Sequence, residues 1–383
     1  MTSHKKIESE PVDGVFRENI PAIQDALLAW FASHQRDFPW RKNYVPYHIW
    51  ISEIMGQQTQ MDRVVDYFLR WIDRFPDIEA VAAAQELLIL KAWEGLGYYS
   101  RAKNIVLAAQ AIMKTHDGQL PADYAKLLAL PGIGPYTAAA IMSIAFNEDF
   151  PLLDANVERL FTRLLDIAQP VKNGRSQSLL RDMAQRLLPG GRARMFNQAL
   201  MEFGALICKP RNPECSSCFL ASYCLALERE TVEARPVRLK KGKAIDIVMA
   251  CGIIEHQGLY YIQQRKPDGV WGSLWEFPGD RLKQGETPQQ AARREIEKKT
   301  AFIVGDLQPF FVVVHHYTKY RVTLHGFTCS LVGGEGTPVL NAALQYRWST
   351  GTGLVDYPFP SGHKQLVDHL LKQQHFVDDL PDL

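Results

Sequence analysis

The hydrophobic pattern of this chain changes its period once, and this change limits the folds that the sequence can adopt. From residue 23 to residue 207 apolar residues recur at helical spacing, without the alternation typical of strands. From residue 245 onward, short runs with strand periodicity appear. A chain of 383 residues is long enough to form two hydrophobic cores. We therefore expect a multidomain protein in which an all-α domain precedes an α+β domain.

The expected elements follow the same change of period. In the first domain we predict helices over residues 23–33, 49–75, 78–115 with one interruption, 123–130, 136–146, 155–163, 179–188 and 196–207. In the second domain we predict strands over 245–255, 259–265, 310–316, 321–331 and 346–349, and helices over 288–300 and 363–373. We interpret the polar residues 1–19 as a disordered arm and residues 376–383 as a tail.

Residues 230–244 lose this periodicity and are expected to form a basic linker between the domains. Five cations there are able to follow a phosphate backbone: Arg235, Arg238, Lys240, Lys241 and Lys243. The whole chain has 43 Lys and Arg against 42 Asp and Glu, a net charge of +1, so any affinity for nucleic acid depends on such local patches. The start of the chain has no apolar segment of a signal peptide, and no apolar run reaches the roughly 18 residues of a membrane span. We expect a cytosolic location.

A glycine turn before an alanine-rich helix marks the centre of the first domain. Gly132 and Gly134 precede the expected helix 136–146, whose first N–H groups have no partner within the helix and attract an anion such as a phosphate. Asp154 and Asn156 follow this helix. Such a turn is also common as a plain connection between helices, so a DNA clamp and a structural turn both remain possible at this point.

Three further stretches carry candidate functional side chains. Arg36 and Arg41 flank Trp40, which either stacks on a base or packs over the start of a helix. Glu53 lies among apolar residues that disfavour its ionised form and raise its pKa, as a general acid requires. Residues 95–101 form a glycine-bounded loop with Leu and Tyr at its tip, which is either a packed corner or a wedge between base pairs.

The cysteine spacing predicts a metal site. Cys208, Cys215, Cys218 and Cys224 follow the pattern C-x6-C-x2-C-x5-C, which is compact enough for four thiolates to meet at one centre. These ligands suit either a zinc ion or an iron–sulfur cluster. Cys251 and Cys329 lie in expected strands and are interpreted as buried small hydrophobic residues.

These motifs resemble those of a known family. L-P-G-I-G-P-Y-T at residues 130–137 and L-D-A-N at 153–156 resemble the endonuclease III superfamily, and the cysteine spacing resembles its [4Fe-4S] loop. With the second domain included, the chain resembles the MutY family of adenine-DNA glycosylases. The resemblance implies a helix-hairpin-helix glycosylase domain over residues 20–229 with a [4Fe-4S] loop at 208–224, and a Nudix-like domain over 245–375.

The resemblance also implies an activity and a site. The family hydrolyses the N-glycosidic bond of adenine opposite 8-oxoguanine or guanine in double-stranded DNA, and we expect this chain to do so as a monomer in the bacterial cytoplasm, at the nucleoid. Glu53 matches the acid that protonates adenine, Asp154 the carboxylate that stabilises the sugar cation, and Asn156 a side chain near the sugar. Tyr136 stands where bifunctional relatives carry a Schiff-base lysine, so lyase activity is not expected.

Two further groups of residues are implied by the resemblance. The base pocket is expected to contain Arg36, Trp40, Arg41 and Gln198. Contacts with the lesion and the DNA are expected from Gln58, Thr59, Leu96, Tyr98, Gly132, Gly134, Tyr317 and Thr318.

The chain departs from family patterns at four positions. Lys298 and Lys299 stand where Nudix hydrolases carry metal-binding glutamates, and since divalent cations require carboxylate oxygens, Nudix hydrolysis is not expected. Lys319 ends the stretch that matches the lesion-reading loop. Gly56 replaces a bulky apolar residue beside the base pocket.

Three other functions compete with this interpretation. A non-catalytic lesion-binding protein would not require both Glu53 and Asp154. A Nudix pyrophosphatase with a DNA-binding appendage is disfavoured by Lys298 and Lys299. A thymine mismatch glycosylase on the same scaffold is the third alternative, although such relatives generally lack a Nudix-like domain.

Overall fold

The computed structural model describes residues 18–237, 244–332 and 336–378. Most of the expected arm, the end of the expected tail and four linker cations (Arg238, Lys240, Lys241 and Lys243) lie outside these ranges. The chain divides into two compact units. The first unit contains the described residues up to Ala83 and from Asn104 to 237, and the second contains Ala84–Lys103 and the described residues from 244 onward.

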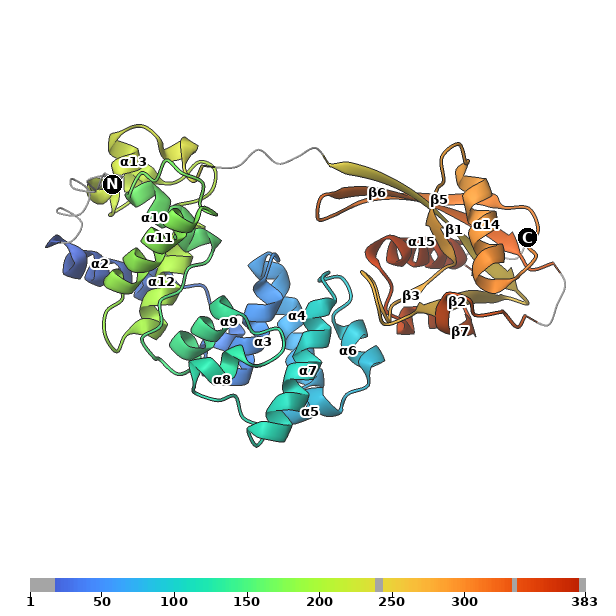
Figure 1. Cartoon of the computed structure of the whole chain (residues 1–383), viewed down its shortest axis with the longest axis horizontal. Coiled ribbons are helices and arrows are strands. Elements are labelled where there is room, and N and C mark those ends of the chain that lie inside the picture. The colour runs from blue at the N-terminus through green and yellow to red at the C-terminus, as the bar shows by residue number, and fades with distance from the viewer. Residues whose placement is uncertain (1–17, 238–243, 333–335, 379–383) are drawn as a thin grey trace, which may run out of the picture. The chain divides into compact units, whose positions relative to one another are not determined.

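Helices and helical turns are the regular elements found in the described residues of the first unit, as expected (Figure 1). Its helices are α2 (Ile20–His34), α3 (Pro46–Gly56), α4 (Met61–Arg74), α5 (Ile78–Ala83), most of α7 (Ser100–Thr115), α8 (Tyr124–Leu128), α9 (Pro135–Ala140), α10 (Ala155–Leu164), α11 (Gly174–Leu187), α12 (Ala193–Leu206) and α13 (Leu225–Glu228). A π-helical turn at Ile141–Ala145 continues α9, and 3-10 turns lie at Pro39–Arg41, Cys215–Ser217, Ala221–Tyr223 and Val232–Ala234.

The prediction of one helix over residues 49–75 is wrong, because the chain breaks between α3 and α4. Gln58 has a φ of +59°, a left-handed conformation that a right-handed helix cannot contain. Helix α4 then restarts at Met61 after Gln60, which has an extended backbone. The break places Gln57–Gln60 in a loop beside the end of α3.

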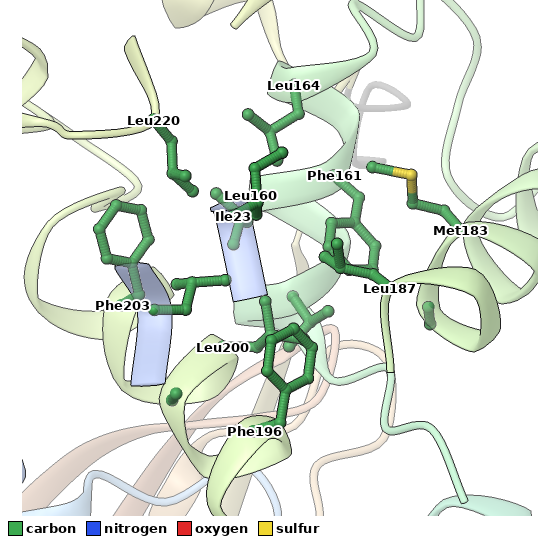
Figure 2. Close-up of a cluster of buried hydrophobic side chains, with 14 of the residues drawn as sticks. Ile23, Leu160, Phe161, Leu164, Met183, Leu187, Phe196, Leu200, Phe203 and Leu220 are labelled. Carbon is green, nitrogen blue, oxygen red and sulfur yellow. The ribbon is translucent and has the colours of Figure 1, made fainter. Parts of the chain in front are cut away.

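One hydrophobic cluster of the first unit lies between α2, α10, α11 and α12 (Figure 2). Apolar residues at helical spacing on α10, among them Leu160, Phe161 and Leu164, face Phe196 and Phe203 of α12. Full burial of side chains of this kind stabilises the fold by about 1.5–3 kcal/mol each. This packing fixes α10, which has Asp154 as its N-cap and Asn156 in its first turn.

The second unit is built on a mixed sheet (Figure 1). The strands in its described residues are β1 (Ile245–His256), β2 (Leu259–Arg265), β3 (Trp275–Glu276), β4 (Gly279–Arg281), β5 (Gln308–Tyr317), β6 (Tyr320–Ser330) and β7 (Ala343–Ser349). The order is β3-β2-β1-β6-β5, with β4 paired to β1 and β7 to β2. Strands β1 and β6 run parallel, and all other pairs are antiparallel.

Helices cover both faces of this sheet. Ile253 packs with Leu366 of α15 (Ser361–Asp378), whereas its neighbour Ile254 packs with Ile296 of α14 (Pro288–Thr300), because successive side chains of a strand point to opposite faces. Helix α6 (Glu86–Ala92) also belongs to this unit, and its Leu87 packs against the cluster on the α15 side. An α+β fold is therefore confirmed for the C-terminal part of the chain. No helix in the described ranges has the length and apolar character needed to cross a lipid bilayer.

Candidate active site

Glu53 projects from α3, a helix held by buried apolar residues on both sides of it. Its Oε2 accepts a hydrogen bond of 2.9 Å from the hydroxyl of Tyr136, in the first turn of α9. Burial raises the pKa of Glu53 to about 7, while the Tyr136 hydrogen bond and the charge of Arg41 oppose this rise. The raised pKa expected from the sequence is confirmed, and the carboxyl group holds a proton in a large fraction of molecules near neutral pH.

Asp154 is the N-cap residue of α10. Its Oδ1 accepts hydrogen bonds from the backbone N–H groups of Asn156 and Val157, at 2.9 Å and 2.8 Å, and its Oδ2 accepts one of 2.8 Å from Asn156 Nδ2. Burial raises the pKa of Asp154, and these three hydrogen bonds oppose the rise. The positive end of the α10 dipole also favours the anion. The chain thus places two buried carboxyl groups at one site, and Asp154 is the one whose anionic form accepts three hydrogen bonds.

Asn156 is itself fixed from behind by Arg159. Arg159 Nη2 donates to Asn156 Oδ1 at 3.0 Å and to the carbonyl of Gly204 in α12, and its Nε donates to the carbonyl of Cys208 at 2.7 Å. A side chain at Gly204 would meet the Asn156 backbone at 2.9 Å, so α12 approaches α10 closely here. One buried guanidinium therefore connects the site to the cysteine loop.

Two hollows meet at the carboxylates. The inner hollow, of about 450 Å³, has Glu53, Asp154 and Asn156 on its wall. The outer hollow, of about 850 Å³, shares these three residues. All four expected base-pocket residues also line the inner hollow: Arg36, Trp40, Arg41 and Gln198. The outer hollow adds Gln58, Thr59 and Tyr136.

The inner hollow contains a buried carboxylate that sequence reasoning missed. Glu202 on α12 is only 1% exposed and accepts hydrogen bonds from Arg36 Nε at 2.7 Å and Arg41 Nη2 at 3.0 Å. Burial alone would raise the pKa of Glu202, but its bonds to both arginines outweigh this and lower it. The sequence does mark Glu202 as unusual, because it is an acidic residue inside the apolar run A-L-M-E-F-G-A of 199–205.

Trp40 packs more tightly than a residue that only stacks on a ligand. It is 6% exposed, and its ring lies 4.8 Å from that of Phe38 and 5.1 Å from that of Phe68. It still forms part of the wall of the inner hollow. The packing interpretation of Trp40 therefore holds, together with a position beside the site.

The departure at Gly56 has a local compensation. A Cβ atom at Gly56 would lie 2.9 Å from the terminal methyl of Met61, which therefore occupies the space of the missing side chain. Met61 contributes to the wall of both hollows. The pocket is thus bounded here by a flexible thioether from α4 instead of a side chain from α3.

The glycine turn lies outside both hollows. Gly132 has a φ of +74°, and a Cβ there would lie 2.5 Å from the Cβ of Asn104, so a larger residue is excluded. Gly134 is the N-cap of α9. The turn therefore sets the start of the helix that carries Tyr136 toward Glu53.

In the second unit the structure brings two expected lesion contacts together. The ring of Tyr98 lies 6.0 Å from that of Tyr317 at the end of β5. Thr318 and Lys319 form the exposed tip between β5 and β6, and Thr318 has a φ of +52°. Leu96 is only 7% exposed. In this structure it therefore forms part of a packed corner, and would have to move to enter a base stack.

The four cysteines surround one cavity with an otherwise largely apolar wall. Arg163 Nη1 lies 3.3 Å from Cys208 Sγ, and burial and the neighbouring thiols raise the pKa of Cys218 to about 11. Four thiols gathered in a low-dielectric cavity need a cationic centre to be stable as thiolates. The donor set therefore fits an iron–sulfur cluster. Cys251 and Cys329 are buried in the sheet, as expected.

Lys299, which stands where Nudix hydrolases carry a metal-binding glutamate, places a fixed ammonium group at that position. Lys299 Nζ is buried and donates to Glu276 Oε1 at 3.1 Å and to the carbonyl of Gly279 at 2.6 Å. Lys298 is mostly exposed and lies 3.4 Å from Glu295. These carboxylates are thus already paired with side-chain cations.

Comparisons with known proteins cover both units. Three family models match: "HhH-GPD superfamily base excision DNA repair protein" at residues 51–184, "Iron-sulfur binding domain of endonuclease III" at 208–224, and "NUDIX domain" at 249–369. The second match confirms the expected iron–sulfur loop.

Adenine DNA glycosylases are among the similar curated proteins. That of Buchnera aphidicola (from Schizaphis graminum) is 34% identical over 68% of this chain and 75% of its own length. That of Rattus norvegicus is 30% identical over 87% of this chain and 74% of its own length. Among solved structures, a thermostable thymine-DNA glycosylase matches 55% of this chain and 98% of its own, with 30% identity and a TM-score of 0.52.

Proposed function

Because this chain belongs to the adenine DNA glycosylase family, we propose that it removes adenine mispaired with 8-oxoguanine or guanine from double-stranded DNA. The single observation that best supports this is the pair of carboxyl groups at the meeting point of the two hollows. Burial raises the pKa of Glu53 to about 7, so a large fraction of molecules keeps this proton near neutral pH, and three hydrogen bonds favour the anionic form of Asp154. An acid that protonates the leaving base and an anion that stabilises the sugar cation both accelerate cleavage of a bond between a base and a sugar.

The reaction follows from these two roles. Adenine must leave the duplex to be reached, and the inner hollow accepts it with Glu53 at its wall. Glu53 donates its proton to a ring nitrogen, the bond between base and sugar breaks, and the bonding electrons remain on adenine. Asp154 stabilises the resulting oxocarbenium-like sugar. Water then adds to the sugar carbon and loses a proton, which leaves an abasic site.

Tyr136 gives the site a monofunctional character. Its phenol donates a hydrogen bond to Glu53, whereas a Schiff base with the sugar would need an amine at that position. The product is therefore an intact abasic strand. We assign recognition of the base to the polar side chains of Arg36, Arg41 and Gln198 on the wall of the inner hollow. A hydrogen bond of 2.9 Å from Gln198 Nε2 to the carbonyl of Arg194 orients Gln198.

The cysteines of residues 208–224 hold a [4Fe-4S] cluster that supports the fold of the first unit. Arg159 donates to the Cys208 carbonyl and to Asn156, so the loop geometry supports the position of Asn156. We assign the C-terminal unit to reading the base opposite adenine, through Tyr98, Tyr317 and Thr318. Lys299 disfavours divalent metal binding and hence Nudix hydrolysis.

Thymine excision is the second candidate because one similar solved structure is a thymine-DNA glycosylase. That match extends over only 55% of this chain, whereas the rat adenine DNA glycosylase matches 87% of it. A lesion-binding protein without catalysis would not need both Glu53 and Asp154. We further propose that the protein acts as a monomer on chromosomal DNA in the bacterial cytoplasm.

One experiment separates these candidates. Purified protein is incubated with four duplexes that hold adenine or thymine opposite 8-oxoguanine or guanine, and strand cleavage is measured before and after alkali. We expect alkali-dependent cleavage of the adenine strands only. Cleavage at thymine would support the second candidate, and absence of cleavage from all four duplexes would contradict both glycosylase proposals.

A further inference from the structure

The loop Gly95–Tyr98 is tied at both ends to a single residue of the C-terminal unit. Oε1 of Glu94, just before the loop, accepts a hydrogen bond of 2.8 Å from the backbone N–H of Phe359. The hydroxyl of Tyr99, just after the loop, donates one of 3.1 Å to the carbonyl of Phe359. Both polar groups of one backbone residue thus hold the two ends of a four-residue loop.

These contacts are buried and supported by neighbouring residues. Phe359 is fully buried, Tyr99 is 7% exposed, and the side chain of Glu94 is 10% exposed. Lys91 Nζ lies 2.5 Å from Oε2 of Glu94 and donates to the carbonyl of Tyr357 at 3.2 Å. Hydrogen bonds in such a low-dielectric setting are strong, and losing one partner is costly.

The loop itself has little freedom. Gly95, Gly97 and Tyr98 all have positive φ values, of 97°, 71° and 46°. Arg101 Nη2 donates to the carbonyls of Leu96 and Gly97, at 3.0 Å and 3.2 Å. The loop therefore moves as a body when its ends move, and it carries the ring of Tyr98 with it.

Tyr98 lies beside two further aromatic residues of the same unit, Tyr317 and Trp271, which form a row with it. Its ring lies 6.0 Å from Tyr317, and Tyr317 lies 5.8 Å from Trp271. Lys103, one turn further along α7, donates to Ser273 Oγ at 3.1 Å and thereby ties the segment after Trp271 to the same helix. The position of Tyr98 relative to this row depends on where Glu94 and Tyr99 anchor the loop.

We propose that Glu94 and Tyr99 are positioning residues that set the preference for 8-oxoguanine opposite adenine, by anchoring the loop Gly95–Tyr98 on the backbone of Phe359. This inference rests on the proposed function and deepens it. The C-terminal unit contributes to lesion reading through two routes: the hairpin tip that carries Tyr317, and the anchor that places Tyr98 beside it.

The test uses the full-length protein and a set of matched variants. Tyr99→Phe removes one anchoring hydroxyl, Glu94→Ala removes the acceptor, and Glu94→Gln retains an oxygen that can accept from Phe359. Tyr346→Phe on β7 is the control, because it removes the same group from another residue of the same unit. Single-turnover excision is measured for adenine opposite 8-oxoguanine and opposite guanine, and amide hydrogen exchange is followed over residues 95–101.

We expect Tyr99→Phe and Glu94→Ala to lower the preference for 8-oxoguanine by roughly tenfold, which is the effect of one buried hydrogen bond. Glu94→Gln should stay within about twofold of wild type, since it retains the acceptor. Tyr346→Phe should leave both the preference and the exchange unchanged. Exchange over residues 95–101 should rise in the two anchor variants alone.

A double-mutant cycle with Tyr98→Ala separates positioning from general support of the fold. If the anchor acts through Tyr98, adding Tyr99→Phe to Tyr98→Ala causes no further loss of preference. Full additivity, or an unchanged preference in both anchor variants, would overturn the inference. If wild-type protein excises no adenine at all, the proposed function fails, and unchanged exchange in Tyr99→Phe would then overturn the anchor separately.

Discussion

The hydroxyl of Tyr136 donates a 2.9 Å hydrogen bond to Oε2 of Glu53, and this bond opposes the rise in the pKa of Glu53 that burial causes. The acid must be protonated to act, so excision should decrease as pH rises through about 7. Tyr136→Phe removes the bond, so the pKa should rise and the falling limb of the pH–rate profile should move to higher pH. Single-turnover rates from about pH 5 to 9 would measure this. A limb that stays in place would mean that Tyr136 does not tune Glu53.

Glu53→Gln and Asp154→Asn should each lower the excision rate by at least about a hundredfold, because both residues act on charge that develops in the transition state. Affinity for a mispaired duplex should be largely retained, since each variant keeps a side chain of nearly the same size and shape at its place on the walls of the hollows. Glu79→Gln, on the exposed surface of α5, is the matched control and should excise at the wild-type rate. Near wild-type excision in either catalytic variant would refute the assigned roles.

Sequence patterns predicted the residues whose roles are encoded locally. Glu53 is recognisable because apolar neighbours on its own helix surround it, and Asp154 was singled out through the short motif L-D-A-N, although its place as the N-cap of α10 was not predicted. Glu202 was missed because its partners Arg36 and Arg41 lie more than 160 residues away, and no local rule pairs them. From the sequence alone, a buried charged residue is visible only as a charged position that interrupts a run of apolar residues.

The same holds for the fold: elements set by local sequence patterns were predicted, whereas features set by contacts between distant residues were not. The helical and sheet regions follow from hydrophobic periodicity, but the break at Gln58 depends on one left-handed residue that the periodicity does not indicate. The short strands β3 and β4 were also missed, because strands of two or three residues show no alternation. The packing of Ala84–Lys103 with the C-terminal unit rests on contacts such as Tyr99 with Phe359, which are 260 residues apart.

Glu202→Gln should shift the pH profile in the direction opposite to that of Tyr136→Phe. Glu202 balances the charges of Arg36 and Arg41, and Arg41 already lowers the pKa of Glu53. Without the carboxylate, the charge of Arg41 acts more strongly on Glu53, so the falling limb should move to lower pH. Because one member of a buried ionic group is removed, the free energy of unfolding should fall by about 3 kcal/mol. Denaturant unfolding and the pH profile test both effects, and a limb that moves upward would contradict this account.

The purified protein should be brown, with broad visible absorption and about four irons per chain. Cys218→Ser should lower the iron content and the melting temperature together, because the cluster closes the loop that packs on α10 and α12. Cys329→Ala is the control: this thiol is buried in the sheet of the second unit, so iron should be retained. Colourless wild-type protein with stoichiometric zinc would contradict the cluster assignment.

Truncation after residue 230 should separate chemistry from lesion reading. Glu53, Asp154 and the four cysteines all belong to the first unit, so the fragment should still excise adenine. Leu87, Lys91 and Tyr99 would lose the C-terminal residues on which they pack, so the loop Gly95–Tyr98 should lose its anchor as well as its partner Tyr317. The preference for adenine opposite 8-oxoguanine over adenine opposite guanine should therefore fall further than it does in full-length Tyr317→Ala, in which the anchor remains. An equal loss in the two proteins would show that the hairpin alone reads the lesion, and full retention in the fragment would assign lesion reading to Gln58 and its neighbours in the outer hollow.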